Sequence, residues 1–297
     1  MVSQPRVTQR VVRAQHPVWY KVTRVLVRLV LNLLLLALSI TALVPFWWML
    51  SGGFKSLADL FVYPPRMWPT KWSLQGYQKL FRFFPFLRNF WNSVYISGLS
   101  TFGTVFSTSM AAFAFSRMRF KGKNVIFAAV MSTMMIPGVV FMIPRFIMFK
   151  FVGWTNSPLP LIVPAFFTSA YFVFMLRQFF STLPRELEEA ALIDGASWPR
   201  IYFSISLPLI KPALMTMALF TFTGSWNNLL GPIIYLNKLE QLNLTAAMAY
   251  IRSSYHTGES MNVEMAAATV TVIPILIVYL FTQRYIVKGL TFSGIKG

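Results

Sequence analysis

The sequence predicts an all-α, polytopic integral membrane protein with six transmembrane helices. Hydrophobic residues make up 56% of the 297 residues, above the roughly 45–50% that is typical of soluble domains. Charged residues contribute only 12%, about half of their usual share. The apolar residues also gather in six runs, each long enough to cross a bilayer as a helix.

The six predicted spans are residues 25–50, 90–115, 125–148, 159–180, 213–236 and 265–287. The third span contains Pro137 and Pro144, which are expected to kink it. The segments between the spans are a basic tail (1–24), a long loop (51–89), a polar loop (181–212), a second long loop (237–264) and a C-terminal tail (288–297). Within the first long loop, SLQGYQKLF predicts a short interfacial helix.

The distribution of basic residues predicts the orientation of the spans. Cytoplasmic loops of membrane proteins carry an excess of Lys and Arg. Most of the 27 Lys and Arg residues lie on the cytoplasmic side if the N-terminus is placed there. We therefore expect both termini and the loop 181–212 in the cytoplasm, and the two long loops outside. The net charge of +19 is attributed to this bias and to anionic lipid, not to nucleic acid.

Several kinds of chemistry are disfavoured by the composition. The chain has no Cys, and its two His residues are His16 and His256, so we predict no catalytic residues and no metal site. The P-loop pattern G-x-x-x-x-G-K-[ST] is absent from the sequence, and Gly122-Lys123 is its nearest fragment. Any ATP must then be hydrolysed by another chain. None of the 8 acidic residues falls within a predicted span, which argues against an ion-driven secondary transporter.

The polar loop contains the stretch EAALIDGASWPRIYFSISLP. Pro184 suits the start of a helix, and three glutamates, Glu186, Glu188 and Glu189, suit its first turns. Gly195 can adopt the left-handed conformation that ends such a helix, and Ser197 can cap a second one, with Pro199 in its first turn. The loop therefore predicts a helix, a tight glycine turn and a second helix. Two roles stay open: an amphipathic element without a partner, or a docking element that exposes Leu187, Ala191 and Leu192.

The same stretch resembles the signature loop of the permease subunits of bacterial ABC importers. The pattern E-A-A, three residues, G, nine residues, I-x-L-P is matched without a gap by Glu189, Ala190, Ala191, Gly195, Ile205, Leu207 and Pro208. The segments SGGFKSLADLFVYPP, SWNNLLGPIIYL and YIVKGLTFSGIKG resemble the carbohydrate-uptake branch, above all its six-span maltose and glycerol-3-phosphate permeases. The resemblance covers roughly residues 25–297 and implies the type I permease fold of these importers.

The resemblance also implies partners and a mechanism. The expected partners are a second permease, two cytoplasmic P-loop ATPases that bind ATP and Mg, an extracytoplasmic solute-binding protein and the bacterial inner membrane, and no cofactor is expected on this chain. The loop is then a coupling helix that docks into the ATPase. Its residues are Glu189, Ala190, Ala191, Asp194, Gly195, Leu207 and Pro208. The implied substrate is a small-molecule carbohydrate. The alternatives are another small solute, such as a polyol or glycerol phosphate, or secondary transport.

The fifth span contains Trp226, Asn227 and Asn228 near its middle. Amides deep in a membrane must face protein or water. An aromatic face beside amides suits a sugar, so these residues are candidates for lining the substrate path, although they can equally bond neighbouring helices. Two further questions stay open: whether the loop 237–264 contacts the binding protein or is only solvated, and whether the C-terminal tail reaches the ATPase.

Overall fold

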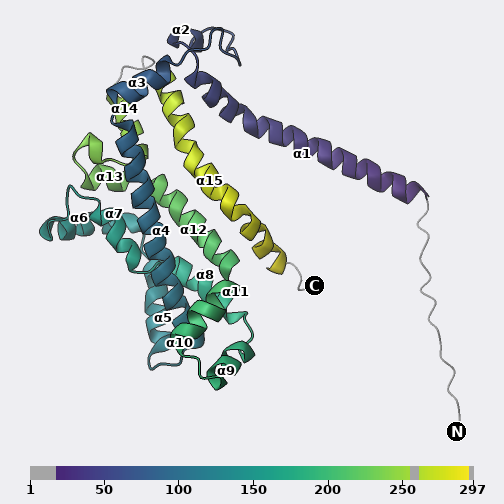
Figure 1. Cartoon of the computed structure of the whole chain (residues 1–297), viewed down its shortest axis with the longest axis vertical. Helices are drawn as coiled ribbons and strands as arrows, with labels where there is room; N and C mark the ends of the chain where they lie inside the picture. The colour runs from purple at the N-terminus through teal and green to yellow at the C-terminus, as the bar shows by residue number, and fades with distance from the viewer. Residues whose placement is uncertain (1–17, 255–260, 294–297) are drawn as a thin grey trace. The chain divides into compact units, whose positions relative to one another are not determined.

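The computed structural model describes residues 18–254 and 261–293, and every regular element in this part of the chain is helical (Figure 1). The chain forms two compact units, Met1–Met49 and Leu50–Gly297. Helix α1 (Val18–Gly53) makes up the described part of the first unit and ends within the second. All other helices belong to the second unit. This agrees with the predicted all-α class.

The second unit is built on four long helices. They are α4 (Phe86–Arg117), α8 (Ala170–Ser181), α12 (Lys211–Trp226) and α15 (Met261–Ser293). The shorter α-helices are α2 (Leu57–Leu60), α3 (Gln75–Phe83), α5 (Lys123–Ser132), α6 (Met142–Phe151), α7 (Leu159–Ile162), α9 (Glu186–Ile193), α10 (Trp198–Ile201), α11 (Leu207–Leu209), α13 (Leu230–Tyr235) and α14 (Leu244–Ser254). The 3-10 turns are η1 (Thr133–Met135), η2 (Gly138–Phe141), η3 (Val163–Phe166) and η5 (Leu239–Gln241), and η4 (Tyr202–Ser206) is a π-helical turn.

Three helical stretches among the described residues are long and apolar enough to cross a membrane. They are Val22–Gly53, Leu159–Ser181 and Met261–Tyr285. Two bent pairs pass the same test together: Lys123–Met135 with Gly138–Phe151, and Trp198–Leu209 with Lys211–Trp226. Helix α4 has the length but not the hydropathy, because its buried face carries many serine, threonine and asparagine side chains. The number of helices that cross the membrane therefore stays a prediction.

Three of the predicted spans are broken, and the fourth is interrupted at residues 167–169, between η3 and α8. The third bends by 94° between Met135 and Gly138, where Pro137 begins a new turn. Pro144 lies in the first turn of α6, where a proline is tolerated, and makes no separate break. The fifth predicted span divides into α12 and α13 at residues 227–229.

Helix α4 is the centre of the second unit. It runs beside α12 and α8, and it also packs against α7, η3 and α14 (Figure 1). One apolar cluster surrounds its C-terminal end and includes Phe113, Phe180 and Ile201. A second cluster surrounds its N-terminal end and includes Phe86 and Trp226.

Polar side chains at the start of α4 bind the backbone of η5. Asn89 donates from Nδ2 to the carbonyls of Leu239 at 2.7 Å and Leu242 at 2.9 Å. Asn92 donates to the carbonyls of Glu240 at 2.9 Å and Leu242 at 3.0 Å. These buried amides bind carbonyls of η5 and of Leu242 just after it, and they fix the segment before α14 onto α4.

Small residues allow three helix backbones to meet at the start of α15. Gly53, at the end of α1, and Gly76, in α3, both lie against this segment. A Cβ at Gly76 would lie 2.7 Å from the carbonyl oxygen of Asn262 and 3.1 Å from that of Gly53. Since both neighbours are backbone atoms, no rotamer change can make room.

Replacing Gly76 with Ala should therefore destabilise the protein by about 1–3 kcal/mol, the usual cost of overpacking. Gly98→Ala is the matched control, because Gly98 is also helical but an added Cβ meets nothing within 4 Å. That control should gain the roughly 0.5–1 kcal/mol by which Ala exceeds Gly in a helix. Thermal unfolding of the purified protein in detergent checks both. Equal melting temperatures for the two variants would contradict the close approach.

Candidate functional site

The stretch singled out in the sequence forms a helix, a glycine turn and a second helix. Helix α9 ends in a Schellman motif, in which Gly195 N–H donates to Leu192 O at 3.1 Å and Ala196 N–H to Ala191 O at 2.9 Å. Gly195 has a φ of +78°, the left-handed conformation expected of it. An added Cβ would meet nothing within 4 Å, so the backbone angle, not space, calls for glycine.

The helix starts close to the expected positions. Helix α9 begins at Glu186, so Pro184 lies just before the helix and not within it, while three glutamates occupy the first turn as expected. Helix α10 begins at Trp198, with Pro199 in its first turn. Ser197 has the extended backbone of an N-cap, but its side chain makes no capping hydrogen bond there.

Helix α9 has a buried face and an exposed face. Glu188 and Ala191, three residues apart, face the protein, and Ala191 packs against the apolar cluster at the end of α4. The exposed face is formed by residues at helical spacing: Glu186, Glu189, Ala190 and Ile193. Ile193 is 87% exposed. The exposed face therefore combines acidic and apolar groups.

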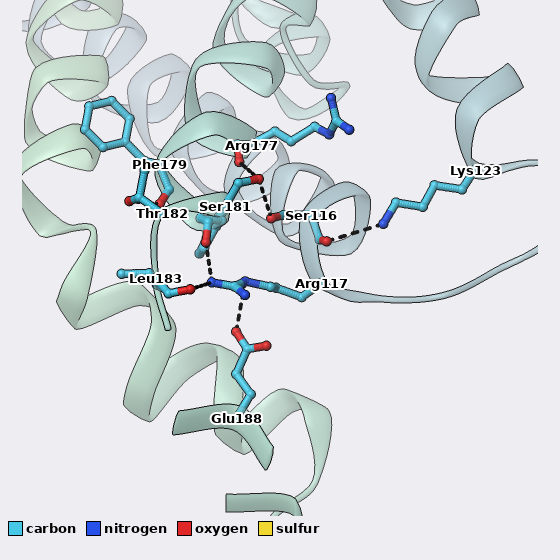
Figure 2. A network of polar contacts seen from close by, with 10 residues as sticks. Ser116, Arg117, Lys123, Arg177, Phe179, Ser181, Thr182, Leu183 and Glu188 are labelled. Atoms are coloured by element: carbon cyan, nitrogen blue, oxygen red, sulfur yellow. Dashed lines mark hydrogen bonds and ion pairs between the residues drawn. The ribbon is translucent and has the colours of Figure 1, made fainter. Parts of the chain in front are cut away.

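Arg117, the last residue of α4, binds the start of this loop from inside (Figure 2). Its Nη2 donates to the carbonyl of Phe180, and to that of Leu183 at 2.6 Å. Its Nε lies 3.1 Å from Oε1 of Glu188 in an ion pair whose side chains are 3% and 9% exposed. One guanidinium group thus connects the ends of α4 and α8 with α9.

Residues of neighbouring helices donate hydrogen bonds to carbonyls at the end of α4, and Figure 2 shows the one from Lys123 to Ser116. Arg177 of α8 donates to Phe115 O at 3.4 Å, and Lys123 donates to Ser116 O at 3.3 Å and Met118 O at 2.9 Å. Cations are favoured at helix C-termini, because the unpaired carbonyls there carry partial negative charge. The ends of α4 and α8 are therefore capped by each other's arginines.

Burial raises the pKa of the Glu188 carboxyl above its ordinary value. The positive charges of Arg117 and Arg185 oppose this shift, and Glu189 adds to it. Without Arg117, the ionised carboxylate would be desolvated with little compensation.

The second half of the loop is fixed to α4 by aromatic contacts. Phe113 packs against Trp198 at 6.2 Å and Tyr202 at 5.2 Å between ring centroids. The Tyr202 hydroxyl lies 2.7 Å from Ser109 Oγ. Of the remaining motif residues, Leu207 is half-buried against the same cluster, whereas Pro208 is exposed. Asp194, at the end of α9, is exposed as well.

The three candidate path residues do not share one face. Trp226 is fully buried, stacked on Phe222 at 5.5 Å and edge-on to Phe90 at 6.0 Å. Asn228 binds the start of α13, since its Oδ1 accepts from Gly231 N at 3.1 Å. Asn227 alone of the three is exposed. Trp226 therefore offers no free aromatic face in this chain, and Asn228 has the bonding role that the sequence left as an alternative.

Carbonyls at the break after α12 are bound by the segment at the start of α14. Thr245 donates to Trp226 O at 2.7 Å, and Asn243 donates to Asn228 O at 2.7 Å. Exposed Asn227 lies between these two hydrogen-bonded carbonyls, so the break after α12 has a defined conformation.

Sequence reasoning missed the pairing of Arg117 with Glu188. Arg117 belongs to the basic group 117–123, whose positive charge was attributed to the orientation of the spans. The sequence did contain one indication of it. Three glutamates lie within four residues at the start of α9, and residues at this spacing cannot all lie on the exposed face of a helix.

Comparison with known proteins places the chain among transport proteins. Residues 103–292 match the sequence model of a family described as "Binding-protein-dependent transport system inner membrane component". The inner membrane ABC transporter permease protein YcjP of Escherichia coli K12 is 34% identical over 263 residues, which cover 87% of this chain and 92% of that protein. The arabinooligosaccharides transport system permease protein AraQ of Bacillus subtilis is 32% identical over 273 residues, covering 91% and 96%.

A solved structure shows the same fold. A chain of a bacterial ABC transporter involved in the import of the acidic polysaccharide alginate superposes with a TM-score of 0.76. The match has 22% sequence identity and covers 89% of this chain and 98% of that chain.

Tyr202→Phe should destabilise the protein by about 1 kcal/mol, because it removes a buried hydrogen bond to Ser109. Tyr171→Phe is the matched control, since Tyr171 in α8 is 55% exposed. Thermal unfolding of both variants provides the measurement. A Tyr202 variant as stable as the control would contradict the contribution of this hydrogen bond.

Proposed function

Because the chain belongs to the family of binding-protein-dependent transport system inner membrane components, we propose that it is a permease subunit of an ATP-driven importer. In this proposal it forms half of the translocation pathway, and a second permease forms the other half. Two cytoplasmic ATPases bind ATP and Mg and hydrolyse the nucleotide, and an extracytoplasmic protein delivers the solute. The absence of a P-loop motif from the sequence supports ATP hydrolysis by a partner.

The exposed face of α9 carries the proposal. It presents Ile193 and Ala190 together with Glu186 and Glu189, on a short helix whose opposite face is held by packing and by an ion pair. An ordered helix with an apolar and charged outer face suits docking into a groove of a partner. Glu189 can pair with a basic group or with backbone N–H groups of that groove.

In this mechanism the ATPases move α9, and the permease converts that movement into alternating access. Closure of two ATPases on ATP displaces the docked helices, and the spans change from an inward-open to an outward-open arrangement. Asp194 and Gly195 form the turn that fixes the direction of α9, while Leu207 and Pro208 lead into α12. The coupling residues thus set geometry and carry out no covalent chemistry.

The proposed solute is a carbohydrate. Relatives of this chain are named for the transport of arabinooligosaccharides and of diacetylchitobiose, which supports this class without selecting a sugar. A polyol or a glycerol phosphate is the alternative. Secondary transport, the other possibility raised by the sequence, does not fit a family whose transport depends on binding proteins.

For the path itself, we assign Asn227 as the lining residue of the group 226–228. Its exposure beside a helix break supports this role, because an amide there can bond to a solute hydroxyl. Trp226 and Asn228 then hold the break in shape. The proposed topology has six crossings and two cytoplasmic termini in a bacterial inner membrane, supported by the distribution of Lys and Arg.

Ile193→Arg should reduce the amount of ATPase that co-purifies with the permease at least tenfold. Burying a guanidinium in an apolar groove costs well over the roughly 1.4 kcal/mol of binding free energy that corresponds to a tenfold loss of affinity. The measurement is gentle solubilisation of the tagged permease from its native membrane, followed by quantification of bound P-loop ATPase. Phe61→Arg is the control. Phe61 is also exposed, at 61%, but it lies before α4 in the loop 51–89, which is predicted to be on the outer side of the membrane. Unchanged ATPase recovery with Ile193→Arg would refute docking through this face.

Gly195→Val should raise the number of ATP molecules hydrolysed per solute transported. A β-branched residue is strained at positive φ by about 1–2 kcal/mol, so the turn after α9 must change direction. Gly153→Val is a matched control, since Gly153 has a φ of +71° and equally open surroundings but lies after α6. Reconstituted complexes in liposomes allow both activities to be measured. The control should lose similar stability and keep the wild-type ratio; a normal ratio for Gly195→Val would contradict the role of the turn.

A further inference from the structure

Two kinds of contact hold α9 in place among the described residues. Ala191 packs against the apolar cluster around Phe113 and Phe180. Glu188 forms the ion pair with Arg117. The first contact is non-directional and permits sliding, whereas the guanidinium that pairs with Glu188 is itself held by hydrogen bonds to the carbonyls of Phe180 and Leu183.

Arg117 is not a local partner of α9. It is the last residue of the 32-residue helix α4, and the same guanidinium binds carbonyls of Phe180 and Leu183, at and just beyond the end of α8. A displacement of Glu188 is therefore applied at once to the ends of two long helices. Helix α4 also packs along α12, so movement of α4 would act on the helix that ends beside Asn227.

The pair lies on the protected side of α9, away from its exposed face. Its two side chains are 3% and 9% exposed, so water and salt screen the pair far less than a surface ion pair. Pulling the pair apart would leave two desolvated charges, and this opposes separation strongly. Under load from a partner on the exposed face, α9 and the end of α4 should thus move as one body.

We propose that the Arg117–Glu188 ion pair is the link that transmits movement of α9 to α4 and α8, with both side chains acting as positioning residues for transport. This inference rests on the proposed function. It assigns a transport role to two residues outside the E-A-A pattern, and it separates docking, on the exposed face of α9, from transmission, on its buried face.

The test uses the whole complex, with its ATPases, second permease and binding protein, reconstituted in liposomes. Three quantities are measured for each variant: the ATPase content, the rate of ATP hydrolysis and the rate of solute uptake. Glu188→Ala and Arg117→Gln should keep the wild-type ATPase content and continue to hydrolyse ATP. The ratio of ATP hydrolysed to solute transported should rise at least tenfold in each. The double variant should raise it no further than the single variants do, because the two residues act as one unit.

Arg177→Gln is the matched control. Arg177 also donates to a helix-end carbonyl in the same cluster, that of Phe115, but it forms no contact with α9 in the structure. It should lower the melting temperature while the ratio stays within twofold of wild type. This control separates loss of transmission from general loosening of the helix ends. If Glu188→Ala does not assemble, Glu188→Gln, which keeps volume and an acceptor oxygen but not the charge, is measured in the same way.

Each other result decides against the inference. A ratio within twofold of wild type for an assembled Glu188 variant would show that transmission does not use the pair. A rise as large with Arg177→Gln would assign the effect to loosened helix ends, and loss of bound ATPase from the Glu188 and Arg117 variants would assign it to docking. A wild-type complex without any ATPase would instead overturn the proposed function, and this inference with it.

Discussion

The carbonyl groups left unpaired at helix ends are the constraint on which the rest of the structure depends. Water cannot satisfy them within a membrane or a packed interior, so other parts of the chain must do so. Here arginine and lysine side chains serve the ends of α4 and α8, and Thr245 and Asn243 serve the break after α12. Because each donor comes from a different element than the acceptor, satisfying the backbone also fixes how the helices are arranged.

Helix α4 carries donors of this kind at both of its ends. At its N-terminal end, Asn89 and Asn92 hold η5, and at its C-terminal end Arg117 holds α8 and α9. The helix has too many buried serine, threonine and asparagine side chains for the hydropathy of a lipid-facing span. Those small polar residues permit close packing instead. A helix anchored by directional bonds at both ends is well suited to carry a displacement along its length.

The parts that the sequence predicted depend on local chemistry. A glycine after a short acidic helix specifies its own turn, so the conformation of Gly195 followed from neighbouring residues alone. The long apolar runs likewise predicted helices, and Pro137 predicted a bend. The pairing of Arg117 with Glu188 could not be predicted in this way, because it joins distant segments and depends on which side of α9 faces the protein. Trp226 shows the same limit: its position near a helix break was visible, but its burial against Phe90 and Phe222 is a property of the assembled fold.

The contact between the end of α4 and α9 is a buried ion pair, and this chemistry indicates what the contact contributes. A buried ion pair is a weak source of stability, and well-packed apolar residues of similar volume often stabilise a protein as well or better. The surrounding cluster already supplies apolar contact, since Phe113, Phe180 and Ala191 meet beside the pair. What apolar side chains cannot supply is a buried charge held at one place, whereas the Arg117 guanidinium is held by two carbonyls and pairs with the Glu188 carboxylate. Arg117 thereby ties the position of α9 to the ends of α4 and α8, which is the connection that the proposed transmission of movement requires.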